Sequence, residues 1–101
     1  ALVDPRNDVW VSAASSWELA TKVKAGKLTL DVRRLMSGLQ ERGIRLLGIG
    51  VDDGIEAAGL AWPHRDPFDR MLVAQSNRAG LTLVTRDRSI LAFSGVTTLL
   101  G

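Results

Sequence analysis

The sequence predicts an α/β domain with a mainly parallel sheet. Short β-branched stretches alternate with amphipathic stretches along the 101 residues, as in strands that are connected by helices. This length suits one modest core, so we expect a single domain over residues 1–101. Acidic residues follow two of the predicted strands, and ligands of an open parallel sheet bind beyond the carboxyl ends of its strands.

The predicted strands share β-branched and leucine-rich runs and are Val9–Ser12, Ile44–Ile49, Leu81–Thr85 and Val96–Leu100. The predicted helices carry apolar residues at helical spacing and are Ala14–Ala25, Val32–Arg42, Val51–Leu60 and a helix from Asp66 to about Gly80. Gly48 weakens the second strand. Ala1–Asp8, with a Pro and an Asn-Asp pair, is expected to be the tail of a preceding element that runs into a turn. Ser89–Phe93 is expected to be a turn of helix or a loop.

The composition narrows the classes of protein. The chain has no cysteine, which excludes disulfides and thiolate metal sites and favours a reducing, cytoplasmic location. No apolar run has the length of a membrane span, so we expect no membrane partner. The net charge of +2 is too small to indicate nucleic acid, although ten of the thirteen basic residues are arginine, the better phosphate ligand.

The segment Trp62–Ala79 contains the strongest local signal. Asp66 suits a helix N-cap, and Pro67 suits the first helical position. Asp69 falls three residues after the cap, where it either completes a capping box or serves chemistry. The residues spaced to face a core are Phe68, Met71, Leu72, Gln75 and Ala79.

Glu18, Asp69 and Asp87 are the candidate site. Glu18 begins the helix after one strand and Asp87 follows another, so both belong at one edge of the sheet. Asp69 joins them if its helix starts at that edge. Three carboxylates there need neutralisation, and an oxygen-only ligand set suits Mg²⁺ or Mn²⁺. The neighbouring arginines that would form a basic rim are Arg65, Arg70, Arg86 and Arg88.

Each of these acids also has a structural explanation. Glu18 has capping-box spacing from Ser15 and lies four residues before Lys22, with which it could form an exposed ion pair. Surface ion pairs of this kind contribute only about 0–1 kcal/mol. The acids by themselves therefore leave open whether they bind a metal or only stabilise helix ends.

Three segments resemble a known family. VSAASSWELATKVKAGKL, GLAWPHRDPFDRMLVAQS and GLTLVTRDRSI are similar to PIN-domain proteins of the VapC type, the toxins of bacterial type II toxin–antitoxin pairs. The resemblance implies a three-layer α/β/α fold and an endoribonuclease that hydrolyses RNA with Mg²⁺- or Mn²⁺-activated water. It implies a cognate antitoxin as partner, and such toxins commonly form homodimers.

The resemblance assigns roles to individual residues. The family's metal-binding acids fall on Glu18, Asp69 and Asp87, and Thr85 matches the hydroxyl residue before the last acid. Arg70, Arg86 and Thr85 would contact the RNA phosphate, with Thr85 alternatively holding a water molecule. Asp66 matches the motif without being a usual metal ligand, so capping remains its interpretation and metal binding an additional role.

One part of the family pattern is not found. The family begins with a strand that ends in Asp-Thr, and that Asp is a principal metal ligand, but the only acids before Val9 are Asp4 and Asp8. The first strand and helix therefore look missing, which should leave neighbouring strands unpaired. We expect a defective metal site in this chain alone. The alternative function is a truncated or degenerate PIN module that binds RNA or a protein without cutting.

The remaining aromatic residues and the only histidine have mainly structural interpretations. His64 is expected to be a solvated loop residue, although it could contact RNA. Trp17 lies on the apolar face of its helix and is expected in the core. Trp62 is the best candidate for stacking on a base, with packing as the favoured alternative.

Overall fold

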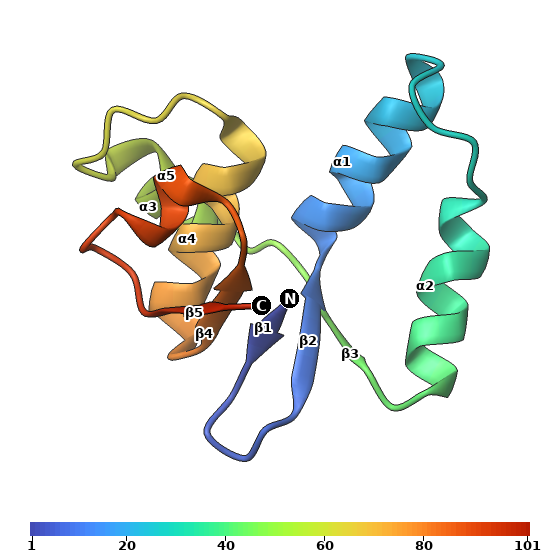
Figure 1. The fold of residues 1–101 in the computed structure, drawn as a ribbon, viewed down its shortest axis with the longest axis horizontal. Coiled ribbons are helices and arrows are strands. Elements are labelled where there is room, and N and C mark those ends of the chain that lie inside the picture. The colour runs from blue at the N-terminus through green and yellow to red at the C-terminus, as the bar shows by residue number, and fades with distance from the viewer.

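A computed structural model describes residues 1–101 and contains a five-stranded sheet with helices on both sides. The strands are β1 (Leu2–Val3), β2 (Val9–Ser12), β3 (Arg45–Leu47), β4 (Thr82–Thr85) and β5 (Thr98–Leu100). The helices are α1 (Ala13–Lys24), α2 (Val32–Glu41), α3 (Val51–Gly59), α4 (Pro67–Ala79) and α5 (Arg88–Leu91). Figure 1 shows α1 and α2 on one side and α3, α4 and α5 on the other, the three-layer α/β/α arrangement.

The strand order is β3-β2-β1-β4-β5. β2 pairs with β3 and β4 pairs with β5 in parallel, whereas β1 pairs antiparallel with both β2 and β4. The sheet is thus mixed, with four strands running in one direction. It consists of two parallel pairs that a two-residue strand joins at the centre.

β1 corrects a prediction about the start of the chain. Ala1–Asp8 was expected to be the tail of a preceding element that runs into a turn, and Leu2 and Val3 form a strand that is central in the sheet. The neighbouring strands were expected to be unpaired, but Leu2 aligns with Trp10 on one side and with Leu83 on the other. Two residues are too few for a reliable periodicity, which is why the pattern did not reveal this strand.

Asp4 organises the turn that lets β1 and β2 pair. Its Oδ1 accepts hydrogen bonds from the backbone N–H groups of Arg6 at 2.9 Å and Asp8 at 3.0 Å. Asn7 takes a φ of 65°, a left-handed conformation that Asn tolerates better than most residues. The Asn-Asp pair therefore does form a turn, as predicted, but inside a hairpin.

The core lies between β1, β4 and the helices α4 and α5. Its buried members are Leu2, Val73, Leu81, Leu83 and Ile90. α4 buries its residues from Val73 to Ser76, including Gln75, which is 1% exposed and was predicted to face inward. The helix ends at Gly80, which is left-handed at φ 67° and caps it as predicted.

α1 differs from expectation at its start and in the exposure of Trp17. α1 begins at Ala13 with Ser12 as its N-cap, so Glu18 is not a capping-box partner of Ser15. Trp17 is 53% exposed instead of lying in the core, and its ring meets that of Phe68 on α4 edge-on, with the centroids 4.5 Å apart. In α3 the buried residue is Ala57, and Ile55 is 67% exposed. None of the helices is long and apolar enough to cross a membrane.

Candidate active site

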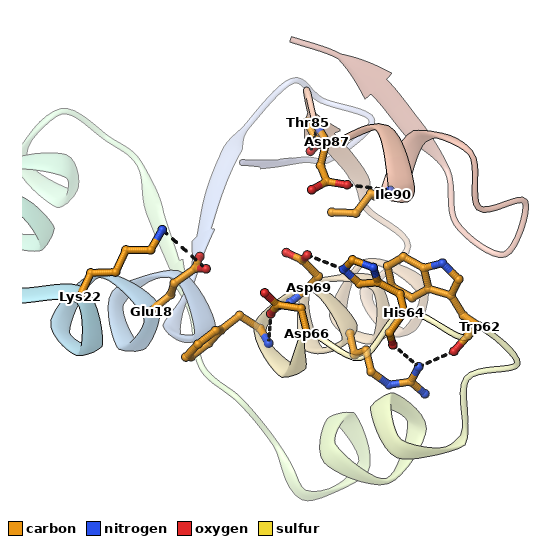
Figure 2. A network of polar contacts seen from close by, with 11 residues as sticks. Glu18, Lys22, Trp62, His64, Asp66, Asp69, Thr85, Asp87 and Ile90 are labelled. Atoms are coloured by element: carbon orange, nitrogen blue, oxygen red, sulfur yellow. Dashed lines mark hydrogen bonds and ion pairs between the residues drawn. The ribbon is translucent and has the colours of Figure 1, made fainter. Parts of the chain in front are cut away.

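The start of α4 is built as the sequence predicts. Asp66 is the N-cap, and its Oδ1 accepts from the backbone N–H groups of Phe68 at 2.8 Å and Asp69 at 3.1 Å. Pro67 occupies the first turn, where no N–H is needed. These bonds make Asp66 the N-cap of α4, and Asp69 is the third residue of that helix. Figure 2 shows Asp66 and Asp69 at this helix end, with Asp87 on a separate element.

Asp69 forms a close pair with His64. His64 Nε2 lies 2.7 Å from Asp69 Oδ2, and both side chains are mostly buried, with 23% and 18% of their surface exposed. The expectation of a solvated loop residue is therefore wrong for His64. Burial raises the pKa of Asp69, the His64 hydrogen bond lowers it, and the charges of Asp66 and Asp87 raise it, with a net rise above the ordinary value of 3.8.

Trp62 is closed between two other rings. It stacks on His64 with centroids 4.4 Å apart and on Phe93 with centroids 4.7 Å apart, at interplanar angles of 19° and 6°. Both faces of the indole are thus covered within the protein. Of the two interpretations of Trp62, the structure supports packing, because no face remains on which an RNA base could stack.

Asp87 and Thr85 form the end of β4. Asp87 caps α5 by accepting the Ile90 N–H on Oδ1 at 3.0 Å (Figure 2), and Thr85 Oγ1 accepts the Asp87 N–H at 3.0 Å. Thr85 thereby sets the turn that aims Asp87. The charge of Asp87 contributes, after burial and the charge of Asp66, to the raised pKa of Asp69, so the two carboxylates interact electrostatically.

Glu18 lies on α1 and pairs along its own helix. Its Oε2 lies 3.9 Å from Lys22 Nζ, which is the ion pair that the spacing allowed. The role of Glu18 as a metal ligand together with Asp69 and Asp87 stays a prediction.

The acids suit a hard divalent cation by chemistry but not by placement. Carboxylate oxygens are the ligands that Mg²⁺ and Mn²⁺ prefer. The structure, however, contains no group of three or more acidic, histidine or cysteine side chains that could hold a metal ion. Asp69 contacts His64, Asp87 caps α5 and Glu18 pairs with Lys22, so each predicted ligand has a partner within the protein.

Arg70 has a different role from the one predicted. All five of its N–H groups donate to backbone carbonyls between Ala57 and His64. In this arrangement Arg70 has no donor left for a phosphate, because its fork turns away from the acids toward α3. Arg86 is exposed, and its Nε donates to the Gly101 carbonyl. Phosphate binding by Arg86 stays a prediction.

Sequence reasoning missed two contacts of this site. His64 precedes Asp69 by five residues, and Arg70 follows it directly. Neither spacing places two residues on the same face of a helix or strand, and Asp66 begins the helix between His64 and Asp69. The signal that was present is chemical: one histidine and one arginine flank the acid in the segment WPHRDPFDR. Only the path of the loop before α4 turns that proximity in sequence into contact.

The fold, together with the acidic residues at the edge of the sheet where β4 ends, defines a class of protein. A mixed, mostly parallel sheet between helical layers carries acidic residues where β4 ends and α4 begins, an arrangement suited to phosphodiester chemistry. Residues 1–96 match the PIN domain family, and the chain belongs to that family. PIN domains are generally nucleases and usually use divalent metal ions. Comparisons with curated proteins and with solved structures give no match.

Replacing Asp69 with asparagine is expected to raise the melting temperature at neutral pH. Because the pKa of Asp69 is raised, the folded protein binds its proton more tightly than the unfolded chain does. The ionised carboxylate therefore costs stability above its folded pKa, and this cost disappears as the pH falls through that value and below 3.8. Thermal melts of parent and variant from about pH 7 down to about pH 3 should show the gain shrinking to nothing.

Asp52→Asn is the matched control for that series. Asp52 is exposed and faces Arg78 at 3.5 Å, so its replacement removes one carboxylate without relieving a buried one. It should give no gain in melting temperature. A lower melting temperature for Asp69→Asn at pH 7 would mean that the His64 contact outweighs burial and repulsion.

Proposed function

We propose that this chain is a ribonuclease of the VapC toxin type, which hydrolyses RNA phosphodiester bonds and is restrained by a cognate antitoxin. Membership of the PIN family supports a nuclease in general. The resemblance of HRDPFDRMLVAQ and LVTRD to VapC toxins supports the narrower class. The first segment contributes Asp69 in the first turn of α4, and the second contributes Asp87 just after β4.

The observation that carries the proposal is the mostly buried Asp69 at the start of α4, whose carboxylate is also exposed to the charges of Asp66 and Asp87. A mostly buried carboxylate beside two other negative charges is an unfavourable arrangement for stability. Strained electrostatics of this kind concentrate at functional sites, where the charge is needed for chemistry. Asp69 and Asp87 are therefore the residues that we propose as essential. Mg²⁺ or Mn²⁺ remains the predicted cofactor, and RNA, the antitoxin and a second copy remain the predicted partners.

RNA cleavage tests this function. The chain is incubated with RNA and Mn²⁺ or Mg²⁺, in parallel with chelator, with Asp69→Asn and with the control Asp52→Asn. We expect cleavage that chelator abolishes and that Asp69→Asn reduces by about 10²–10³-fold, the scale on which a single electrostatic group acts at a reacting centre. Asp52→Asn should cleave like the parent. Cleavage that survives both chelator and Asp69→Asn would refute the proposal.

A second function is a PIN module that binds without cutting. The observation in its favour is that Glu18, Asp69 and Asp87 do not form one metal-binding group and that each has a partner within the protein. If the folded chain does not cleave RNA with either metal, fluorescence anisotropy with labelled single-stranded RNA decides whether it binds. Binding without cleavage would establish this alternative.

A further inference from the structure

We infer that Arg70 is a positioning residue, which fixes the loop from Leu60 to Asp66 and thereby holds the His64 imidazole on Asp69. The inference deepens the proposed function in one respect, since it concerns a residue that orients a neighbour of the candidate acid. It rests on the contacts of Arg70 and needs no assumption about the substrate.

The first step is the number of acceptors that Arg70 serves. Its Nε donates to Ala57 O at 3.0 Å, and its Nη2 donates to Ala58 O at 3.3 Å and Leu60 O at 3.1 Å. Its Nη1 donates to Trp62 O at 2.6 Å and His64 O at 2.9 Å. One planar guanidinium thus satisfies five carbonyls along eight residues of chain, with every donor used.

Arg70 also caps the end of α3. The last carbonyls of a helix have no partner within it, and a left-handed residue often follows to supply one. Here Leu60 follows α3 with φ −59° and ψ 129°, so no left-handed cap forms. Arg70 replaces that cap from another helix, and its positive charge lies where the helix dipole is negative. Arg70 therefore determines the direction in which the chain leaves α3.

The bonds of Arg70 also hold the loop from Leu60 to Asp66 in place beside Asp69. Two of the five carbonyls belong to Trp62 and His64, the residues whose rings stack on each other. Fixing both carbonyls sets the backbone on either side of Pro63, and the Trp62 stack on Phe93 fixes the indole. With the backbone and the stacked ring fixed, the imidazole is held with its Nε2 on Asp69 Oδ2 (Figure 2).

Lysine cannot take over this role. It keeps the positive charge but presents three donors from a single nitrogen, which cannot reach carbonyls spread over eight residues. Arg70→Lys should therefore free the loop while it preserves the charge of the helix. The matched control is Arg78→Lys on the same helix, where the arginine is partly exposed and pairs with Asp52 and Asp53 instead of backbone carbonyls.

The test is the NMR signal of His64, which is the only histidine and so gives a single set of ring resonances. In the parent its ring protons should be shifted upfield by the stacked Trp62 ring, and a long-range ¹H–¹⁵N spectrum should report the Nε2 hydrogen bond. At the same pH, Arg70→Lys should lose most of the upfield shift and the hydrogen-bond signature. Arg78→Lys should keep both. A folded Arg70→Lys with unchanged His64 signals would overturn the inference.

A measurement on the unaltered chain covers the case in which Arg70→Lys does not fold. With all five donors bonded, the Arg70 guanidinium should rotate slowly and show separate, exchange-protected Nη–H signals at low temperature. Averaged and rapidly exchanging Arg70 signals would also overturn the inference.

RNA kinetics then separate this inference from the proposed function. If the parent cleaves RNA, Arg70→Lys should lower kcat with little change in KM, because Arg70 has no donor left for RNA. A raised KM with unchanged kcat would mean that Arg70 holds the substrate and would refute positioning. If the parent does not cleave while the His64 signals respond as expected, the nuclease proposal fails and the positioning role stands.

Discussion

Leu2→Ala is expected to destabilise the protein by about 2–5 kcal/mol, the range for a buried leucine that is truncated in a core. Leu2 is 0% exposed, belongs to the central strand and packs with Val73 and Leu83 in the core. Its backbone pairs with Trp10 and Leu83, so the same residue joins the two parallel halves of the sheet. Small domains have total stabilities of about 5–15 kcal/mol, so the loss is a large fraction of the whole.

Urea unfolding of parent, Leu2→Ala and Leu100→Ala measures this effect. Leu100 is the same residue type in another strand of the sheet, but it is 72% exposed, so its truncation should change stability by no more than about 0.5 kcal/mol. Leu2→Ile, which keeps the volume, should cost less than about 1.5 kcal/mol and remains measurable if Leu2→Ala does not fold. Equal losses for Leu2→Ala and Leu100→Ala would contradict a central, buried β1.

Gln75→Leu is expected to be the other large loss, of about 2–4 kcal/mol, through unpaired polar groups rather than a cavity. Gln75 is 1% exposed, accepts a hydrogen bond from Ser12 Oγ and donates to Gly48 O at 3.1 Å. It thereby connects α4 to the ends of β2 and β3. Leucine fills the space but satisfies neither group. Ser12 Oγ is buried, and a buried polar group left unpaired costs about 1–3 kcal/mol, while the part-buried bond to the Gly48 carbonyl is lost as well.

Asn77→Leu is the matched control. Asn77 lies two residues further along α4 and also donates its amide to a glycine carbonyl, that of Gly95 at 2.7 Å, but this bond is exposed. Water can replace it, so the loss should stay below about 1 kcal/mol. If the unfolding free energies of the two variants agree, the buried network around Gln75 contributes nothing specific.

Both predictions depend on features that the sequence revealed to different degrees. Gln75 was predicted to face the core because it recurs at helical spacing with Met71 and Leu72, and helical spacing decides which residues share a face. Leu2 was not predicted, because two residues carry no period. A strand that short is recognised only through the partners on its two sides, which lie far along the chain.

The sequence by itself determined the alternation of strands and helices, the start of α4 at Asp66 and Pro67, and the likeness to PIN domains that the family match confirmed. Caps and periods act within about four residues, so a local pattern is sufficient to encode them.

Only the tertiary structure decided that β1 joins the sheet, that His64 contacts Asp69 and that Arg70 donates to five carbonyls. These contacts depend on the direction in which a chain leaves one element and enters the next. That direction is set by packing and by hydrogen bonds between elements, which no local pattern contains.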